Sequence, residues 1–239
     1  MPNSSFARLL LLSVLVAGPA FPQPTSPATA PIPAPVPVRE EPYHRVAFEN
    51  DYVRVIDVYI PPKVSTLYHI HTLPSVVVEL TKSTILSEEL GQPLPAPKQV
   101  EPGQTRYAPY DETPLTHRVT NQGTNVFHVM DIELVKPNTG DGLSAAVEVP
   151  GMKMAWERKL VRAYDVYVAA GQSCMVPPGN NAYLLISVSG RSDAFAGFDG
   201  RVTQRPLGAG EFLFLPARAS VKLTPRAKDD CAYVLLELK

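Results

Sequence analysis

This chain of 239 residues contains only two cysteines, Cys174 and Cys231, and no histidine beyond His128. A zinc site built on the cysteines is not expected, because their half of the chain has no histidine and no closely spaced second thiol. An exported chain could join the two cysteines in a disulfide. The sequence leaves a disulfide and two buried thiols equally open.

The chain also lacks a surplus of either charge. Its 22 lysines and arginines nearly balance 23 aspartates and glutamates, for a formal net charge of −1. This balance gives no electrostatic reason to expect nucleic acid or an anionic membrane surface as a partner. A glycine-rich phosphate loop, a GxSxG elbow and a Cys/His nucleophile pair are absent too.

Only the N-terminus has a long apolar run, from residue 9 to residue 17, directly after Arg8. The run is short for a membrane span, and small residues follow it up to Ala20. We therefore predict a signal peptide over residues 1–20 and export to the periplasm or beyond, with no membrane span after cleavage. An uncleaved anchor is the alternative. Residues 21–42 are rich in proline and are expected to form a disordered linker outside any sheet.

From Tyr43 onward the chain consists of short β-branched and aromatic stretches separated by turns, such as residues 52–60, 75–80 and 125–134. No long segment has helical periodicity, so an all-β fold is predicted. Residues 53–59 (VRVIDVY) resemble residues 161–167 (VRAYDVY), and residues 132–134 (IEL) resemble residues 236–238 (LEL). Because the two similarities occur in the same order, they indicate duplication of one β-unit. The units are expected at residues 43–137 and 156–239, joined by a linker over residues 138–155 that contains prolines and glycines.

Three histidines form the strongest candidate site. His69 and His71 are two residues apart, so on a strand both point to the same face, and His117 could close on them from a neighbouring strand. Imidazole is the commonest protein ligand for transition metals. The pattern predicts a divalent-metal site of His69, His71 and His117. The alternative is that His69 and His71 lie on an exposed strand face and that His117 packs inside the barrel.

These residues resemble the motifs of the cupin superfamily, in particular those of two-domain bicupins. The first motif is matched by Tyr68-His69-Ile70-His71, and the second by Pro109, His117 and Asn121. The resemblance implies two tandem jelly-roll β-barrels and a divalent transition metal (Fe, Mn, Zn, Ni or Cu) in the first. The second unit has no histidine and would be a degenerate cupin domain.

The acidic ligand of the family would fall near Ser75 or Val76, and neither is acidic. Glu79 keeps strand parity with His71 and is a candidate for the missing carboxylate and for catalysis. His128 is a second catalytic candidate, as a fourth ligand or an acid–base group, although it could instead face a neighbouring strand or the partner barrel. Roles outside metal binding are expected for several other residues: a turn for Asn121, the surface for His44, packing between the barrels for Trp156, and strand-edge packing or a pocket mouth for Tyr68, Tyr107 and Tyr110.

The resemblance leaves dioxygenase, isomerase, decarboxylase and plain binding open. Three-histidine cupins that look similar tend to be iron dioxygenases, so oxygen-dependent cleavage of a small organic acid or diketone-like substrate is the sharpest hypothesis. The alternative is a non-catalytic cupin that binds a small ligand or has a structural role. A small molecule is the expected partner in both cases, and exposed barrel edges would permit a homodimer.

Overall fold

The computed structural model describes residues 33–136, 145–226 and 228–239. The expected signal peptide, and the proline-rich segment up to residue 32, lie outside the described residues. Within the described part of the chain the only helical element is the short 3-10 turn η1 (Val38–Glu40), and all other elements are strands. No helix in this part is long and apolar enough to cross a membrane.

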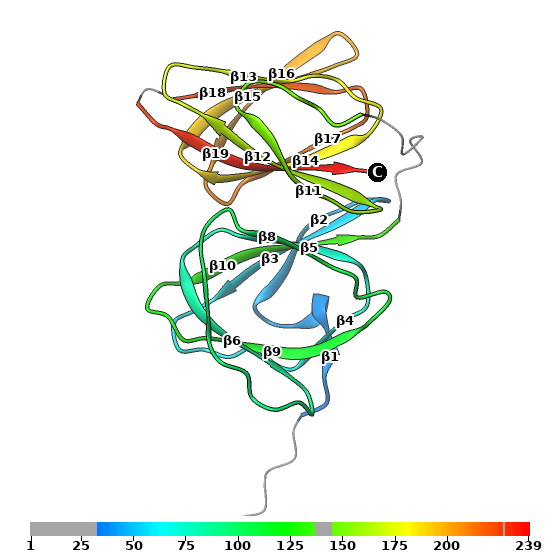
Figure 1. Ribbon diagram of the computed structural model, residues 1–239, viewed down its shortest axis with the longest axis vertical. Coiled ribbons are helices and arrows are strands. Elements are labelled where there is room, and N and C mark those ends of the chain that lie inside the picture. Colours follow the sequence, from blue (N-terminus) through cyan, green and yellow to red (C-terminus); the bar gives the residue numbers. More distant parts are fainter. Residues whose placement is uncertain (1–32, 137–144, 227) are drawn as a thin grey trace, which may run out of the picture. The chain divides into compact units, whose positions relative to one another are not determined.

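The first half of the described chain forms two five-stranded sheets (Figure 1). One has the order β1-β4-β9-β6-β7 and the other the order β2-β3-β10-β5-β8. The bounds are β1 (Val36–Pro37), β2 (His44–Glu49), β3 (Val53–Ile60), β4 (His69–His71), β5 (Ser75–Glu79), β6 (Ser83–Glu89), β7 (Lys98–Val100), β8 (Thr105–Ala108), β9 (Leu115–Asn121) and β10 (Phe127–Leu134).

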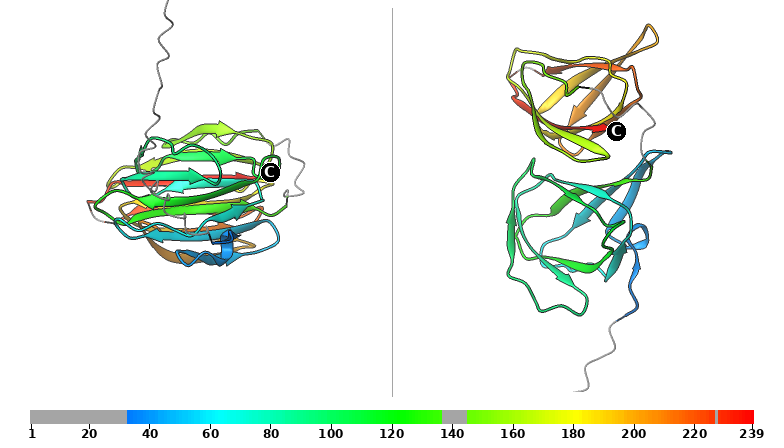
Figure 2. Two further views of the ribbon diagram at one scale, coloured as in Figure 1. Left: turned by 90° about the horizontal axis from the view of Figure 1, so that it is seen from below. Right: turned by 45° about the vertical axis from the view of Figure 1, so that its right-hand side comes forward.

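The second half repeats this plan with a five-stranded sheet, β11-β12-β19-β14-β17, and a four-stranded sheet, β13-β18-β15-β16. In each half the two sheets face one another, as the right-hand view of Figure 2 shows. The bounds are β11 (Met152–Glu157), β12 (Val161–Val168), β13 (Cys174–Val176), β14 (Ala182–Ser189), β15 (Arg191–Phe198), β16 (Arg201–Gly208), β17 (Phe212–Leu215), β18 (Ser220–Pro225) and β19 (Cys231–Leu238). The prediction of an all-β chain with two jelly rolls is confirmed.

The strand register confirms the internal repeat. Glu133 lies opposite Arg54 where β10 pairs with β3, and Glu237 lies opposite Arg162 where β19 pairs with β12. Both cross-strand pairs are also ion pairs. The same charged pair therefore occupies the same position in both halves, as duplication of one β-unit requires.

Strand β10 is buried on both faces, which explains its nearly continuous apolar sequence. Phe127 and Val129 belong to the interior of the first half. Met130 and Ile132, on the other face, belong to a hydrophobic cluster that also contains residues of β12, β14 and β19. Trp156 packs against this shared cluster and donates a hydrogen bond from Nε1 to Thr105 Oγ1 at 2.8 Å, so its expected place between the barrels is confirmed.

Two predicted segment boundaries are wrong. Val36 and Pro37, assigned to the disordered linker over residues 21–42, form β1, a parallel edge strand beside β4. The edge tolerates Pro37 because an edge strand needs donors on one side only, and the Val36 N–H donates to the Tyr68 carbonyl at 3.0 Å. Strand β11 begins at Met152, within the predicted linker over residues 138–155, where a mostly exposed edge strand shows no alternating pattern.

Candidate metal centre

The structure brings together the three histidines of the predicted site. The three-residue strand β4 directs His69 and His71 to its buried face, and β9 places His117 directly opposite His69. All three side chains are buried, and each offers a ring nitrogen within 4.8 Å of the others. These residues form the only such group of three or more His, Cys, Asp or Glu in the part of the chain that the structure describes.

Two of the three imidazoles are held by hydrogen bonds through Nδ1, and the third, His71, has a carboxylate beside its Nδ1. His69 Nδ1–H donates to the Leu67 carbonyl at 2.9 Å, and His117 Nδ1 hydrogen bonds with Ser87 Oγ at 2.8 Å. His71 Nδ1 lies 3.2 Å from a carboxylate oxygen of Asp131. Partners of this kind on the far nitrogen are typical of metal-binding histidines, whose orientation and tautomer they fix.

The Nε2 atoms have no partners outside the cluster. Those of His71 and His117 hydrogen bond to each other at 3.1 Å, and that of His69 is buried without a hydrogen-bond partner. A buried acceptor without a partner is costly, and a cation among the three nitrogens would remove that cost. The donor set of three convergent imidazoles therefore fits a divalent transition metal ion, whose identity the ligands alone do not fix.

The electrostatics at His69 and His117 favour the neutral imidazole, the form that binds metals. Burial, and to a smaller extent the neighbouring His44, lower the pKa of His69 to about 4. Burial also holds the pKa of His117 well below its ordinary value. Burial acts to raise the pKa of Asp131, but His71, His44 and Ser75 together outweigh it and the net pKa is lowered.

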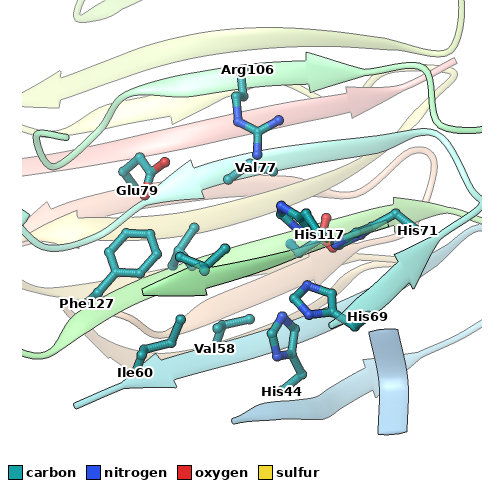
Figure 3. A pocket seen from close by; sticks show the side chains of 13 residues that line it. His44, Val58, Ile60, His69, His71, Val77, Glu79, Arg106, His117 and Phe127 are labelled. Atoms are coloured by element: carbon teal, nitrogen blue, oxygen red, sulfur yellow. Dashed lines mark hydrogen bonds and ion pairs between the residues drawn. The ribbon is translucent and has the colours of Figure 1, made fainter. Parts of the chain in front are cut away.

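The histidines lie in the wall of a small cavity between the two sheets of the first half (Figure 3). Its volume is about 50 Å³, room for roughly three or four water molecules. The remaining polar walls are His44, Glu79, Arg106 and Asp131, and apolar side chains complete the lining: Val58, Ile60, Val77, Val119, Phe127 and Val129.

Glu79 lines this cavity, as its strand parity with His71 suggested, but it is not part of the three-histidine cluster. Its Oε2 atom is buried without a hydrogen-bond partner. Burial raises its pKa to about 7, against the opposing effect of Arg106 and Lys98. Glu79 is therefore a proton-carrying group in the wall of the cavity, and the expectation that it supplies the family's carboxylate ligand is not met in this arrangement.

His128 lies outside the cavity, which corrects its candidacy as a fourth ligand or acid–base group. Its Nε2 hydrogen bonds with Asp57 Oδ1 at 2.8 Å, and its ring stacks on Tyr59 with the centroids 4.0 Å apart. On the other side it lies against Gly210, in the second half of the chain. The alternate residues of β10 face opposite ways, so Asp131 enters the cavity and His128 faces the partner barrel.

His44 was expected on the surface, and the structure shows that this is wrong. Only 5% of its side chain is exposed, and its ring centroid lies 4.6 Å from that of His69. The cause is Glu41, whose buried carboxylate accepts the His44 Nδ1–H at 2.5 Å and backbone N–H groups of Tyr43 and Leu67. In the sequence, His44 alternates in step with Val46 and Phe48, the less exposed residues of β2, and this alternation was the available signal.

Asn121 is buried at the end of β9, where its Nδ2 donates to the carbonyls of Ile60 and Asn125. Its Oδ1 accepts from Ser83 Oγ and from Gly123 N–H, so it organises the following turn and lies outside the three-histidine cluster. Of the three tyrosines near the motifs, Tyr110 packs on His71, with ring centroids 4.9 Å apart. The others lie elsewhere: Tyr107 beside Trp156 and Tyr68 under Arg118.

The second half has apolar side chains where the first has its histidines. Strand β13 corresponds to β4, and Cys174 lies opposite Leu223 there as His69 lies opposite His117. Cys174 and Cys231 are both buried as free thiols in the interior of this half. The second unit is thus filled by a hydrophobic core, as expected for a degenerate cupin domain.

Comparison with known proteins gives matches in structure only. No family model matches the chain, and no curated protein matches its sequence. AerE from Microcystis aeruginosa is 11% identical and aligns over 83% of this chain and 98% of its own, with a TM-score of 0.55. The formate complex of Lactobacillus farciminis oxalate decarboxylase is 8% identical over 80% of this chain and 78% of its own, with the same TM-score. Coconut allergen cocosin is 13% identical over 78% and 77% of the two chains, with a TM-score of 0.53.

The protein has the two-domain cupin fold. The alignments cover 78–83% of this chain, so they extend over both halves of the described chain. At such low identity the likeness extends to the fold alone. The function of this protein must therefore follow from its own three-histidine cavity.

Proposed function

We propose that this bicupin is a metal-dependent enzyme in which His69, His71 and His117 hold one divalent metal ion, and that it uses dioxygen to cleave a small organic substrate. The observation that carries the proposal is the convergence of three buried imidazoles, two of them hydrogen bonded through Nδ1 and the third beside the Asp131 carboxylate. A bound transition metal ion would supply a Lewis acid with open coordination positions and, if redox-active, a partner for dioxygen.

The surrounding residues have distinct roles in this proposal. Leu67, Ser87 and Asp131 orient the imidazoles through their Nδ1 atoms. The apolar lining excludes bulk water, which strengthens every electrostatic interaction inside the cavity. Glu79 holds a proton at a carboxyl group whose pKa of about 7 suits both proton donation and proton acceptance near neutral pH.

The test is oxygen uptake by metal-free protein reconstituted separately with Fe(II), Mn(II) or Zn(II), offered small organic acids and β-diketones. We expect turnover with a redox-active metal, loss of turnover in His117→Ala, and retention in His128→Gln, because His128 lies outside the cavity. Stoichiometric metal without oxygen uptake on any substrate would contradict the dioxygenase and favour the alternative of a non-catalytic ligand-binding cupin.

We further propose that the chain is exported. The support is the sequence of residues 1–20, a basic residue followed by an apolar run and small residues. N-terminal sequencing of the protein recovered from a bacterial host is expected to begin at Phe21, in the periplasmic or extracellular fraction. Recovery of the intact chain in the cytoplasmic fraction would contradict export.

A further inference from the structure

Arg106 is the one basic side chain other than histidine that lines the three-histidine cavity. It extends from β8 toward the cavity, as Figure 3 shows. One guanidinium nitrogen donates to the Tyr110 hydroxyl at 3.2 Å, and the Tyr110 ring packs on His71. Arg106 is thus tied through one buried tyrosine to a predicted metal ligand, which fixes where its charge lies relative to the cluster.

The guanidinium of Arg106 has no carboxylate partner among the described residues, since none lies within ion-pair distance of it. Arg54 and Arg162, the arginines of the internal repeat, are each paired with glutamates. A guanidinium is a planar fork of donors that matches a carboxylate in two parallel hydrogen bonds. Arg106 is therefore free to supply this fork to an anion in the cavity.

Neither acidic side chain that lines the cavity pairs with Arg106. Asp131 lies 3.2 Å from His71 Nδ1, and the buried Oε2 atom of Glu79 has no hydrogen-bond partner. An anion that enters the cavity would therefore meet a guanidinium that no carboxylate of the described residues already holds.

A second cavity borders the same two side chains. Arg106 and Glu79 line both the three-histidine cavity and an adjoining cavity of about 270 Å³. Lys98 lies in the wall of the adjoining cavity, with Gln104 and Thr105. Two cationic side chains along one path raise the local concentration of anions.

We propose that Arg106 binds the carboxylate of the substrate, so that the site takes small organic acids rather than neutral diketones. This inference rests on the proposed function, because it names the substrate class of the same metal site. The three-histidine cavity of about 50 Å³ limits the acid to a few non-hydrogen atoms around the carboxylate.

The test measures binding rather than turnover. Acetate and its neutral isostere acetamide are titrated into metal-free and Zn(II)-loaded protein by calorimetry, for wild type, Arg106→Gln and Arg106→Lys. Arg201→Gln, an exposed arginine on β16, is the matched control. Metal content and circular dichroism of each variant show that the site and fold persist.

We expect acetate to bind wild type in preference to acetamide, and Arg106→Gln to bind acetate roughly 10- to 100-fold more weakly while keeping its metal. Arg106→Lys should be intermediate, because a lysine keeps the charge and loses the fork. Arg201→Gln should bind acetate as wild type does. Equal acetate affinity in wild type and Arg106→Gln would overturn the inference and leave the metal site intact. If the protein binds no metal, the proposed function is refuted instead. The acetate titrations of metal-free wild type, Arg106→Gln and Arg106→Lys then still test whether Arg106 binds a carboxylate.

Discussion

Glu79 carries the most direct prediction about pH. The residue is only 6% exposed, and burial raises its pKa from 4.5 to about 7. Between these two values the folded protein holds a proton that the unfolded chain has released. The contribution of Glu79 to stability is therefore fully present below pH 4.5 and is lost as pH rises to about 7. Glutamine is neutral at every pH, so Glu79→Gln removes this dependence.

The size of the effect follows from the pKa difference. A change from 4.5 to about 7, at about 1.4 kcal/mol for each pH unit, corresponds to about 3 kcal/mol. The buried histidines contribute the opposite slope, because the unfolded chain protonates them first as pH falls. Only the difference between wild type and Glu79→Gln isolates Glu79, since the histidines are common to both.

The assay is urea unfolding of metal-free wild type and Glu79→Gln at intervals from pH 4 to pH 8. Relative to the variant, wild type should lose up to about 3 kcal/mol across this range, most of it between pH 4.5 and 7. Glu40→Gln, an exposed glutamate on η1, is the matched control and should show no such loss. A difference between wild type and Glu79→Gln that does not change with pH would refute the claim that this carboxyl is buried and protonated.

Other residues give independent predictions. Asp131→Asn should weaken metal binding about 10- to 100-fold in a chelator competition, because His71 loses the carboxylate that orients it; unchanged affinity would contradict this role. Gly210→Ala should destabilise the protein by about 1–3 kcal/mol in urea unfolding, since a Cβ at φ +82° would lie 2.6 Å from His128 Cε1. The cost should shrink in a His128→Ala background, and equal costs would show that the two residues do not touch. Glu237→Ala should destabilise by about 3 kcal/mol, because it leaves Arg162 in the protein interior without this partner, and a neutral result would contradict that account.

The sequence predicted the fold and the histidine cluster because both depend on short-range patterns. The chain repeats one segment around Arg54 and Arg162, and the same strand pairing follows in both halves. His69 and His71 are two residues apart, and because side chains alternate between the two faces of a strand, they share one face. His117 could be added from its motif. The structure shows the antiparallel pairing with β4 that brings it opposite His69.

The residues that sequence analysis missed depend on long-range packing. His44 enters the cavity only because Glu41 is buried beneath it, and nothing local marks Glu41 as buried. Arg106 and Asp131 look like ordinary strand residues, and only the pairing of β5 with β8 and β10 brings them to one cavity. The direction of the His128 side chain could not be predicted from β10 alone, and it depends on the packing of its ring against Gly210 in the second half of the chain.

Metal content tests the central claim most directly. The protein, purified without a histidine tag and reconstituted with divalent metal, should contain about one ion per chain. His69→Ala/His71→Ala should lose it while keeping its β-sheet circular dichroism, and His128→Gln should keep both. No metal in the wild type after reconstitution, or equal metal in the double variant, would contradict a three-histidine metal centre in this protein.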